Sequence, residues 1–344
     1  MKRIADHLSD VKNKQVIVRC NFDVPIEEGV VQDTTRIEDS LSTIKLLREN
    51  SCKLILLSHH GRPDGSYHES MSLKPVSEVV RELVGEPVDF LSYQEDVAEL
   101  RPSNEANITL VDNLRFWAGE EENDMEFAQK LSSFGEVYVN QAFANCHRKH
   151  ASMVSLPTLL PAYAGVALAN EVEILSKARN NPDKPLAVII GGAKLETKEP
   201  LVSVFTDVAD NILVGGKVAL DLQEKNSEMP SNVTVADMIE NGKDITKESA
   251  EKFAQIVQQA ATVIWNGTMG VFEEEEYQAG TKILAEAVNT TSAFTIVGGG
   301  DTETALTELA LQDGIDFISS GGGAMLTFLS DGKLVALTAL EKAT

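Results

Sequence analysis

Cysteine is scarce in this chain of 344 residues, and the three cysteines that occur are not grouped. Cys20, Cys52 and Cys146 form no Cys-x-x-Cys pair, and their number is odd. These features argue against a disulfide scaffold and against a zinc site. Unpaired thiols are typical of a reducing compartment, so we expect a cytoplasmic protein.

Long apolar runs are also missing. No run approaches the roughly 20 apolar residues that a membrane-spanning helix needs. The first ten residues, MKRIADHLSD, carry two basic side chains without an apolar stretch behind them, so they do not predict a secretory signal. The net charge of -23 makes nucleic acid and anionic membranes poor partners. This acidity has two open explanations, general solubility or adaptation to high salt.

Arginine and histidine are absent after residue 179. All ten arginines lie between Arg3 and Arg179, and all six histidines between His7 and His150. From residue 180 onward the chain has 11 lysines against 25 acidic residues. Guanidinium groups are the preferred bidentate partners of phosphate and carboxylate. The first half is therefore predicted to bind an oxyanion, although a chance skew would give the same distribution.

The length allows two domains of ordinary size, and the pattern in each is α/β. Short apolar runs alternate with amphipathic stretches, which is typical of open, mainly parallel sheets with helices on both faces. We expect two such three-layer, Rossmann-like sheets. The predicted helices of the first half are 36–49, 75–84 and 125–134. The predicted strands are 15–19, 53–57, 108–111 and 137–140, then 186–190, 211–214, 262–265, 294–297 and 317–319.

A domain junction is predicted near residue 180. Residues 163–179 have helical spacing, and the turn-forming sequence NNPDKP follows at 180–185. We therefore expect a first domain at 1–162, a connecting helix and hinge at 163–182, and a second domain at 183–334. Residues 335–344 form a tail.

Several predicted strands of the second half end in glycine. Their carboxyl ends would gather at one edge of a parallel sheet, where ligands of open α/β folds bind. Glycine lets backbone N–H groups approach phosphate oxygens, although tight turns also use glycine for steric reasons alone. Neither a Walker A sequence nor GxGxxG is present, which argues against a P-loop kinase and leaves nicotinamide binding without support. The four loops are 190–194, 214–217, 297–302 and 320–324.

Cationic side chains of the first half follow its predicted strands. Asn21 and Asp23 are two residues apart in an extended stretch, so both face one side and could share a ligand hydroxyl. Arginines at strand ends are most often surface residues, but their joint placement predicts one anion-binding edge. The segments concerned are 19–25, 35–36, 58–63, 113–116 and 140–150.

Read together, these segments resemble phosphoglycerate kinases over the whole length of the chain. The ordered matches are RCNFDVP at 19–25, DTTRI at 33–37, SHHGRP at 58–63, SLKPV at 72–76, DNLRF at 112–116, HRKHAS at 147–152, GGAKLETK at 191–198, WNGTMGVFE at 265–273, GGGDT at 298–302 and GGGAMLTFL at 321–329.

The resemblance implies phosphoryl transfer between 1,3-bisphosphoglycerate with ADP and 3-phosphoglycerate with ATP, with Mg²⁺. It implies that the first domain binds the phosphoglycerate and the second the nucleotide. Domain closure about a hinge, return of the tail to the first domain, and a monomer are also implied. The phosphoglycerate residues would be Asn21, Asp23, Arg36, His59, Arg62, Arg115 and Arg148.

The resemblance also assigns roles near the transferring group. Arg36 looks like the catalytic arginine, Lys194 meets the transferring phosphoryl group, and Asp301 is associated with magnesium. Gly321, Gly322 and Gly323 match the helix start that supports the phosphoryl oxygens. The nucleotide-binding residues would be Lys198, Asn266, Glu273, Gly299, Gly300, Asp301 and Thr302, with Glu273 towards the ribose.

The sequence departs from the family at several positions. The usual Asp-x-Asn of the first motif is exchanged, as Asn21-Phe22-Asp23, and a displaced carboxylate could repel an anionic ligand. The segment between Val218 and Ala261 is visibly shorter than in the family, which puts adenine recognition and nucleotide preference in doubt. The single-residue departures are Gln141, Thr197, Lys217 and Thr268.

Two other functions stay open. A catalytically weak binding or regulatory protein with this fold is favoured by the shortened segment and opposed by the retained Arg36, Lys194 and Asp301. A kinase of a different carboxylate is favoured by the exchange of Asn21 and Asp23. Nucleotide affinity without turnover would support the first, and turnover only with another acid would support the second.

Overall fold

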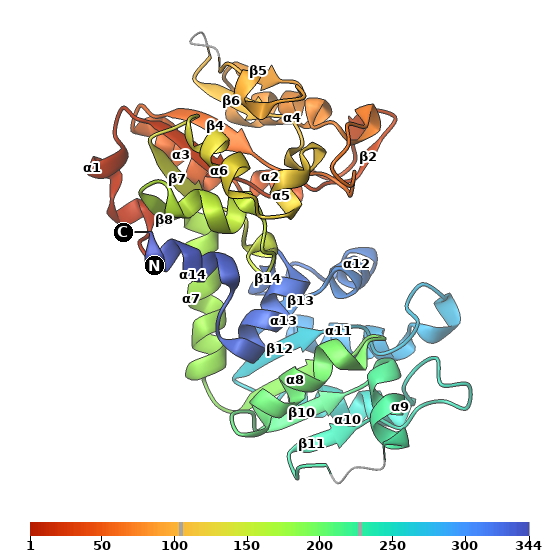
Figure 1. Cartoon of the computed structure of the whole chain (residues 1–344). Helices are drawn as coiled ribbons and strands as arrows, with labels where there is room; N and C mark the ends of the chain where they lie inside the picture. The colour runs from red at the N-terminus through yellow and green to blue at the C-terminus, as the bar shows by residue number, and fades with distance from the viewer. Residues whose placement is uncertain (103–105, 226–228, 344) are drawn as a thin grey trace. The chain divides into compact units, whose positions relative to one another are not determined.

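The computed structural model describes residues 1–102, 106–225 and 229–343. The chain forms two compact units, Met1–Val172 with Lys333–Thr344, and Glu173–Gly332, and the division falls within helix α7 (Val166–Asn180) (Figure 1). Each unit contains one six-stranded sheet. Every strand pair in these two sheets is parallel, so the predicted α/β fold with two mainly parallel sheets is confirmed.

The first sheet has the strand order β5-β6-β4-β1-β7-β8. Its strands are rich in Val, Ile and Leu because both faces are covered by other elements. Val16 and Val18 of β1 join the core under α3 and α4, while Ile17 between them points to the other face and is also fully buried. The strands are β1 (Gln15–Arg19), β4 (Lys53–Leu57), β5 (Val88–Leu91), β6 (Ile108–Val111), β7 (Val137–Asn140) and β8 (Ala162–Ala164).

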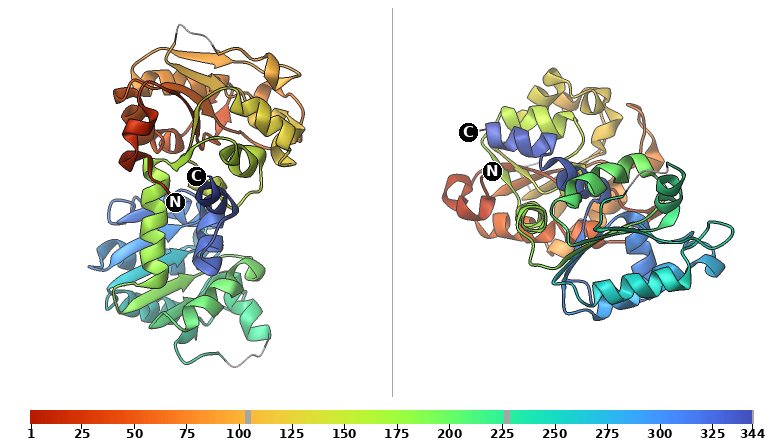
Figure 2. Two further views of the ribbon diagram at one scale, coloured as in Figure 1. Left: turned by 60° about the vertical axis from the view of Figure 1, so that its left-hand side comes forward. Right: turned by 90° about the horizontal axis from the view of Figure 1, so that it is seen from below.

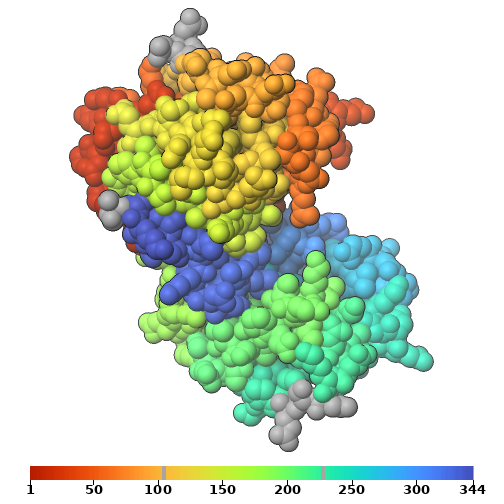
Figure 3. Space-filling view, in the orientation of Figure 1, coloured from red at the N-terminus to blue at the C-terminus, as the bar shows by residue number. Residues whose placement is uncertain are grey.

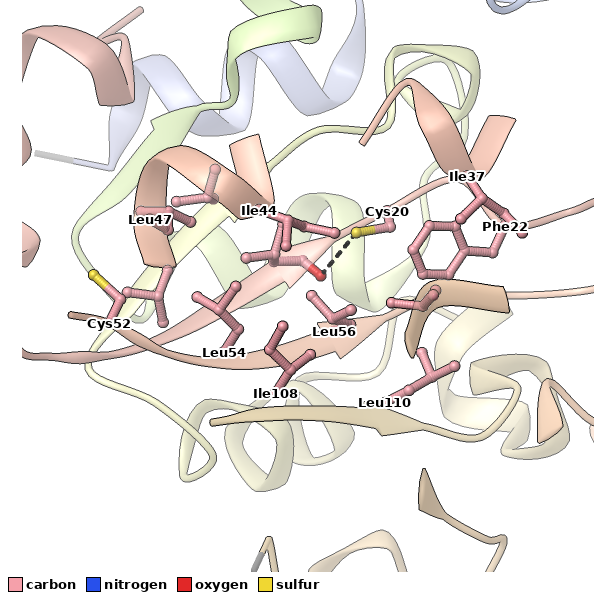
Figure 4. Packing of buried hydrophobic residues seen from close by; sticks show 14 of the residues in the cluster. Cys20, Phe22, Ile37, Ile44, Leu47, Cys52, Leu54, Leu56, Ile108 and Leu110 are labelled. Carbon is pink, nitrogen blue, oxygen red and sulfur yellow. Dashed lines mark hydrogen bonds between the residues drawn. The ribbon is translucent and has the colours of Figure 1, made fainter. Parts of the chain in front are cut away.

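The main core of the first unit packs helices α3 (Leu41–Glu49) and α4 (Lys74–Val84) against this sheet (Figure 4). Ile44 and Leu47 of α3 meet Leu54 and Leu56 of β4 there. Cys20 lies in the same core and donates a hydrogen bond to the carbonyl of Val18. Burial raises the pKa of the Cys20 thiol to about 12, so this cysteine stays protonated and behaves as a small apolar residue.

The carboxyl-terminal helix α14 (Val335–Lys342) belongs to the first unit. It packs against η6 (Ala151–Ser155) and η7 (Leu156–Thr158), and the space-filling view shows the blue tail directly against these yellow-green residues (Figure 3). The backbone N–H of Ala336 donates to the carbonyl of Cys146. The remaining elements of this unit are η1 (Ile4–Asp6), α1 (Leu8–Val11), β2 (Ile26–Glu27), β3 (Val30–Val31), α2 (Thr35–Glu38), η2 (Glu69–Met71), η3 (Val97–Glu99), η4 (Leu114–Phe116), α5 (Ala118–Glu121), α6 (Met125–Ser132) and η5 (Phe143–Asn145).

The second sheet has the order β11-β10-β9-β12-β13-β14. Helices α8 (Leu195–Thr206) and α9 (Gly216–Glu224) cover one face, and α10 (Lys247–Val257) and α11 (Ala279–Thr290) cover the other (Figure 2). Trp265 of β12 is fully buried in the core beneath α10 and α11. The other elements are β9 (Leu186–Ile190), β10 (Asn211–Val214), β11 (Val233–Val235), β12 (Thr262–Asn266), η8 (Glu275–Tyr277), β13 (Phe294–Gly298), α12 (Gly300–Glu308), β14 (Phe317–Ser319) and α13 (Gly322–Asp331).

Two predicted helices differ from the structure. The helix expected at 36–49 is broken into α2 and α3, because the Ser40 N–H bonds the carbonyl of Ile37, three residues back, and tightens the turn. The helix expected from Tyr163 begins only at Val166, since residues 162–164 pair with β7 as strand β8. Pairing with a neighbouring strand here outweighs local helical spacing.

No single helix in the described ranges is long and apolar enough to span a membrane, although α13 and α14 taken together pass that test by length and composition alone.

Candidate active site

The carboxyl ends of the first sheet bring together the polar residues predicted there. Strands β6, β4, β1 and β7 are parallel neighbours, so the segments that follow them lie along one edge. Each predicted residue except Arg36 follows one of these strands; Arg36 lies in α2. The others are Asn21 and Asp23 after β1, His59 and Arg62 after β4, Arg115 after β6 and Arg148 after β7.

Asp23 lies at the centre of this edge. Its Oδ1 accepts a hydrogen bond from the Gly61 N–H at 3.0 Å and lies 3.3 Å from His60 Nδ1, while its Oδ2 is 3.7 Å from His59 Nε2. Burial alone would raise the pKa of Asp23, but the contacts with His60, His59 and Gly61 together lower it. Arg36 donates to the Asp23 backbone carbonyl. The Asp23 carboxylate is therefore ionised and already held by the loop after β4.

Arg115 and Arg148 supply buried donors to the same edge. Arg115 is 2% exposed; its Nη1 donates to the Gly61 carbonyl at 2.6 Å, and its Nε lies 3.1 Å from a Glu121 carboxylate oxygen without hydrogen-bond geometry. Within the described part of the chain, Arg115 Nη2, Arg148 Nε and His147 Nδ1 are also buried without a hydrogen-bond partner. Unpaired buried polar atoms cost free energy, so an anionic ligand would satisfy them.

The structure places the remaining two residues less tightly. Asn21 is 9% exposed and its Oδ1 accepts from the Asn145 side chain at 3.3 Å. Arg62 is exposed and follows Gly61 in the loop after β4. The contacts thus join Asp23, His59 and Arg36 directly, with Arg62 at the surface of the same edge.

The second unit contains a pocket of about 380 Å³ at the carboxyl edge of its sheet. Of the residues predicted to contact the nucleotide or the transferring group, Glu273 and Gly321 are not among its lining, and Glu273 is exposed in the segment after β12. The lining comprises Gly192, Ala193, Lys194, Thr197, Lys198, Asn266, Gly267, Gly299, Gly300, Asp301, Thr302, Gly322, Gly323 and Leu326.

Three helices begin at this pocket. The N-cap residues of α8, α12 and α13 are Lys194, Gly299 and Gly321, and no side chain caps these helices in the described structure. The first backbone N–H groups of a helix lack intrahelical partners and favour negative charge. Three converging starts therefore make the pocket suited to phosphate groups.

Close backbone packing holds these loops together. A Cβ atom added to Gly322 would lie 2.6 Å from the Gly299 Cα, and Gly299 itself has a φ of +110°. Gly216, in the second glycine loop, packs in the same way against Gly192, but it does not line the pocket. Three of the four predicted glycine loops therefore form the pocket, and the second loop supports it sterically.

Lys198 is the buried cation of this pocket. It is 7% exposed and donates to Asn266 Oδ1, while Asn266 Nδ2 donates to the carbonyl of Gly298 at 2.6 Å. Burial lowers the pKa of Lys198 to about 8, and the carboxylate of Asp301 opposes that shift. An anion bound beside Lys198 would restore the charged form.

Asp301 lies in the first turn of α12 and lines the pocket. In the described ranges no three His, Cys, Asp or Glu side chains form a group that could hold a metal ion by themselves. Mg²⁺ is commonly held by one or two carboxylates together with substrate phosphates. One carboxylate beside a phosphate-binding pocket fits that pattern.

Comparison with known proteins identifies the family. The family model described as phosphoglycerate kinase matches residues 4–232 and 221–333. The chain belongs to the phosphoglycerate kinase family. A phosphoglycerate kinase of Finegoldia magna is 37% identical, with 95% of each chain covered, and one of Thermosipho africanus is 36% identical, with 99% of this chain and 98% of the relative covered.

Solved structures agree with this assignment. The phosphoglycerate kinase structure from Coxiella burnetii has a TM-score of 0.84 at 31% identity, covering 97% of this chain and 98% of that one. That from Pyrococcus horikoshii has a TM-score of 0.82 at 27% identity, covering 100% and 99%. The predictions of the family, of a phosphotransferase and of the fold are confirmed.

The comparisons also bear on the shortened segment. The alignment with the Thermosipho phosphoglycerate kinase extends over 394 positions, 50 more than this chain has residues. The two stretches matched by the family model overlap at 221–232, which lies inside the segment Val218–Ala261. Within Val218–Ala261 the structure has most of α9, the three-residue edge strand β11 and helix α10; residues 226–228 of this segment lie outside the described ranges.

Sequence reasoning missed three residues of the first site. His60 and His147 adjoin predicted residues, so the doubled histidine of SHHGRP and the HRKH run were available signals. Arg19 is fully buried at the end of β1, and its Nη2 lies 3.1 Å from His59 Nδ1. Arg19 opens the cationic segment 19–25 and the motif RCNFDVP, but nothing in the sequence indicated that its side chain would be buried against His59.

Proposed function

We propose that this chain transfers a phosphoryl group reversibly from 1,3-bisphosphoglycerate to ADP, giving 3-phosphoglycerate and ATP. The observation that carries the proposal is the presence of two anion-binding edges, one in each unit. Buried guanidinium N–H groups without a hydrogen-bond partner mark the first, and three uncapped helix starts with Lys198 mark the second. Membership of the phosphoglycerate kinase family is the reason for assigning the phosphoglycerate to the first edge and the nucleotide to the second.

In the first site, the phosphoglycerate would be bound by side chains. Arg115 and Arg148 would bind its anionic groups through their unsatisfied N–H donors. Arg36 would lie over the transferring phosphoryl group, where its charge counts most in the transition state. Asn21, Asp23, His59 and Arg62 would complete this site by binding hydroxyl and carboxylate oxygens.

In the second site, the nucleotide phosphates would lie in the pocket. Lys194 would meet the transferring group, Lys198 the nucleotide phosphates, and the N–H groups of Gly322 and Gly323 the phosphoryl oxygens. Asp301 would hold Mg²⁺, which neutralises phosphate charge when bound. Asn266, Gly299, Gly300 and Thr302 would line the nucleotide, and Glu273 would reach the ribose.

The proposed transfer is in-line and follows closure of the two domains about a hinge. An acyl phosphate is already reactive, so positioning and charge stabilisation are sufficient and no strong general base is needed. Closure would exclude water from the transferring group. We further propose that the protein works as a monomer in the cytoplasm, where its three buried thiols stay reduced.

The test is consumption of ATP by the purified protein with 3-phosphoglycerate and Mg²⁺, with the product drained by a coupling enzyme, at low and at molar salt. Arg36→Ala should lower kcat by about a thousandfold while nucleotide affinity stays normal, because the Arg36 charge acts mainly in the transition state. Lys53→Ala, on the strand β4 away from its carboxyl end, is the matched control. Unchanged turnover in Arg36→Ala would refute the role of Arg36, and a folded, nucleotide-binding parent without turnover would refute the activity.

A second candidate function is the phosphorylation of a different carboxylate. The ionised Asp23 carboxylate at the centre of the first site favours it, because this negative charge would repel an anionic group of 3-phosphoglycerate that lay beside it. Replacing 3-phosphoglycerate by other phosphorylated and unphosphorylated carboxylic acids in the same assay separates the two. Turnover with another acid alone would establish the second candidate.

A further inference from the structure

A chain of buried polar side chains leads from the interior of the first unit to His59. It comprises Glu120 of α5, Ser152 of η6, Arg19 of β1 and His59 itself, none of them more than 2% exposed. Three of these four residues have no place in the function proposed above, and His59 there needs only to contact the ligand. Fully buried charges are kept only where partners hold them, so each contact of this chain has a structural consequence.

Arg19 is held from three directions. Its Nε donates to Ser152 Oγ at 2.8 Å, its Nη1 donates to the carbonyl of Cys20, and its Nη2 contacts His59 Nδ1 at 3.1 Å. Ser152 in turn donates from Oγ to one Glu120 oxygen at 2.6 Å and from its backbone N–H to the other at 2.9 Å. The guanidinium plane is thereby fixed, and Glu120 compensates its charge.

The contact between Arg19 and His59 decides the form of the imidazole ring. A guanidinium group has N–H donors and no acceptor, so His59 Nδ1 must be the acceptor and cannot carry a proton. A histidine whose Nδ1 is unprotonated carries its single proton on Nε2 when it is neutral. His59 Nε2 lies on the side of Asp23, at 3.7 Å from Oδ2, which is the side of the candidate phosphoglycerate site.

The charged groups around His59 favour the same neutral form. Burial is the largest cause that lowers the pKa of His59, and the charges of Arg19, Arg115 and Arg148 lower it further. The Asp23 carboxylate acts in the opposite direction. A protonated imidazole would therefore have to form next to three guanidinium groups.

We propose that Arg19, held by Ser152 and Glu120, is a positioning residue that fixes His59 as the neutral Nε2–H tautomer, so that His59 is a hydrogen-bond donor to the phosphoglycerate and not a base. The inference rests on the proposed function of the site. Under this proposal the arginines at this edge have two different roles. Arg115 and Arg148 offer unpaired donors to a ligand, whereas Arg19 acts only through another side chain.

The test is nitrogen-15 NMR of the imidazole rings in the full chain, with His59 assigned by comparison with His59→Gln. We expect the Nε2–H tautomer, without protonation around the ordinary histidine pKa of about 6.5. Arg19→Lys keeps the charge but cannot reach Ser152 and His59 together, so both tautomers should appear. The KM for 3-phosphoglycerate should then rise about fivefold to tenfold, with a smaller change in kcat.

Two further variants complete the experiment. Arg48→Lys, which alters an arginine paired with Glu86 in the same unit, is the matched control and should leave the His59 signals unchanged. If Arg19→Lys does not fold, Ser152→Ala loosens Arg19 without removing it and should give the same mixture of tautomers.

Several outcomes would overturn the inference. These are a His59 that titrates near its ordinary pKa in the parent protein, one that carries its proton on Nδ1, or a tautomer unaffected by both Arg19→Lys and Ser152→Ala. The NMR result does not depend on turnover. A folded parent with the expected tautomer and no kinase activity would therefore refute the proposed function instead.

Discussion

The two candidate sites of this kinase bind anions by different means. In the first unit the donors are side chains at the end of a parallel sheet: Arg115 is buried and Arg148 half-buried, and both carry buried N–H groups without a hydrogen-bond partner. In the second unit they are mainly backbone groups, at the starts of α8, α12 and α13. The same position in the same kind of sheet therefore supports two kinds of phosphate recognition.

This difference explains why no arginine or histidine occurs after residue 179. A site built from side chains needs several cations that converge, and planar guanidinium groups discriminate by geometry. A site built from helix starts needs glycines that let loops touch, and only one or two lysines. We therefore expect the first site to be sensitive to the chemistry of single side chains and the second to the volume at single glycines.

Of the substitutions that test this difference between the sites, Gly322→Ala in the second site is expected to have the largest effect. Its Cβ would overlap the backbone of Gly299, so the start of α13 must shift. We expect the free energy of unfolding to fall by about 2 kcal/mol and nucleotide affinity by about a hundredfold. Denaturant unfolding and calorimetric titration with Mg-ADP measure the two quantities, and binding of 3-phosphoglycerate should be unaffected.

Gly300→Ala is the matched variant for that experiment. No atom lies within 4 Å of an added Cβ there, and the position is in the first turn of α12. Its unfolding free energy should change by less than about 0.5 kcal/mol. Equal loss of stability in the two variants would show that the contact between Gly322 and Gly299 does not hold this site together.

A smaller effect is expected from Arg115→Lys in the first site. Lysine keeps the charge but loses the planar fork, so the bond to the Gly61 carbonyl and the bidentate geometry cannot both be kept. The KM for 3-phosphoglycerate should rise about tenfold to thirtyfold, while affinity for the nucleotide stays unchanged.

Arg179→Lys provides the control for this substitution. Arg179 also donates to backbone carbonyls, those of Leu329 and Ser330, but it lies outside both candidate sites. If Arg115→Lys bound 3-phosphoglycerate as well as the parent protein does, charge alone would be enough and the geometric account of the first site would be wrong.

The sequence predicted the two sites unequally, for a physical reason. The glycine loops could be placed because strand, glycine and helix start follow one another along the chain, and three of the four loops line the pocket. The central strands were predictable from their apolar runs, whereas the short strands β5, β8 and β11 were not. These three are edge strands, where partners distant in sequence decide the structure; the fourth edge strand, β14, was nevertheless predicted.

In the first site the sequence indicated the residues but not their contacts. The distance between Asp23 and His60, or between Arg19 and His59, depends on how β1 and β4 are paired and on the loops after them. Nothing in RCNFDVP or SHHGRP distinguishes a ligand-binding arginine from one that holds a histidine. Burial and hydrogen-bond partners make that distinction, and both are properties of the tertiary structure.

The smallest effect expected to separate the two sites is the uptake of a proton by Lys198 when the nucleotide binds. Burial lowers the pKa of Lys198 to about 8 in the free protein, and bound nucleotide phosphates should raise it again. Below about pH 7 the ammonium group is already charged, so nucleotide affinity should not depend on its titration. Above about pH 8 the free lysine must take up a proton on binding, and affinity should fall by up to about tenfold per pH unit.

Calorimetric titration with Mg-ADP at about pH 8, in two buffers of different ionisation enthalpy, measures this uptake, and about half a proton is expected. Lys198→Arg should abolish the uptake, because guanidinium remains charged at every accessible pH. Lys225→Arg, an exposed lysine paired with Glu199, should leave it unchanged. Uptake that persists in Lys198→Arg would place the titrating group elsewhere, and Lys198 would no longer be the buried cation on which nucleotide binding depends. The arginines of the first site should contribute no such proton to the binding of 3-phosphoglycerate, since their charge does not change over this range.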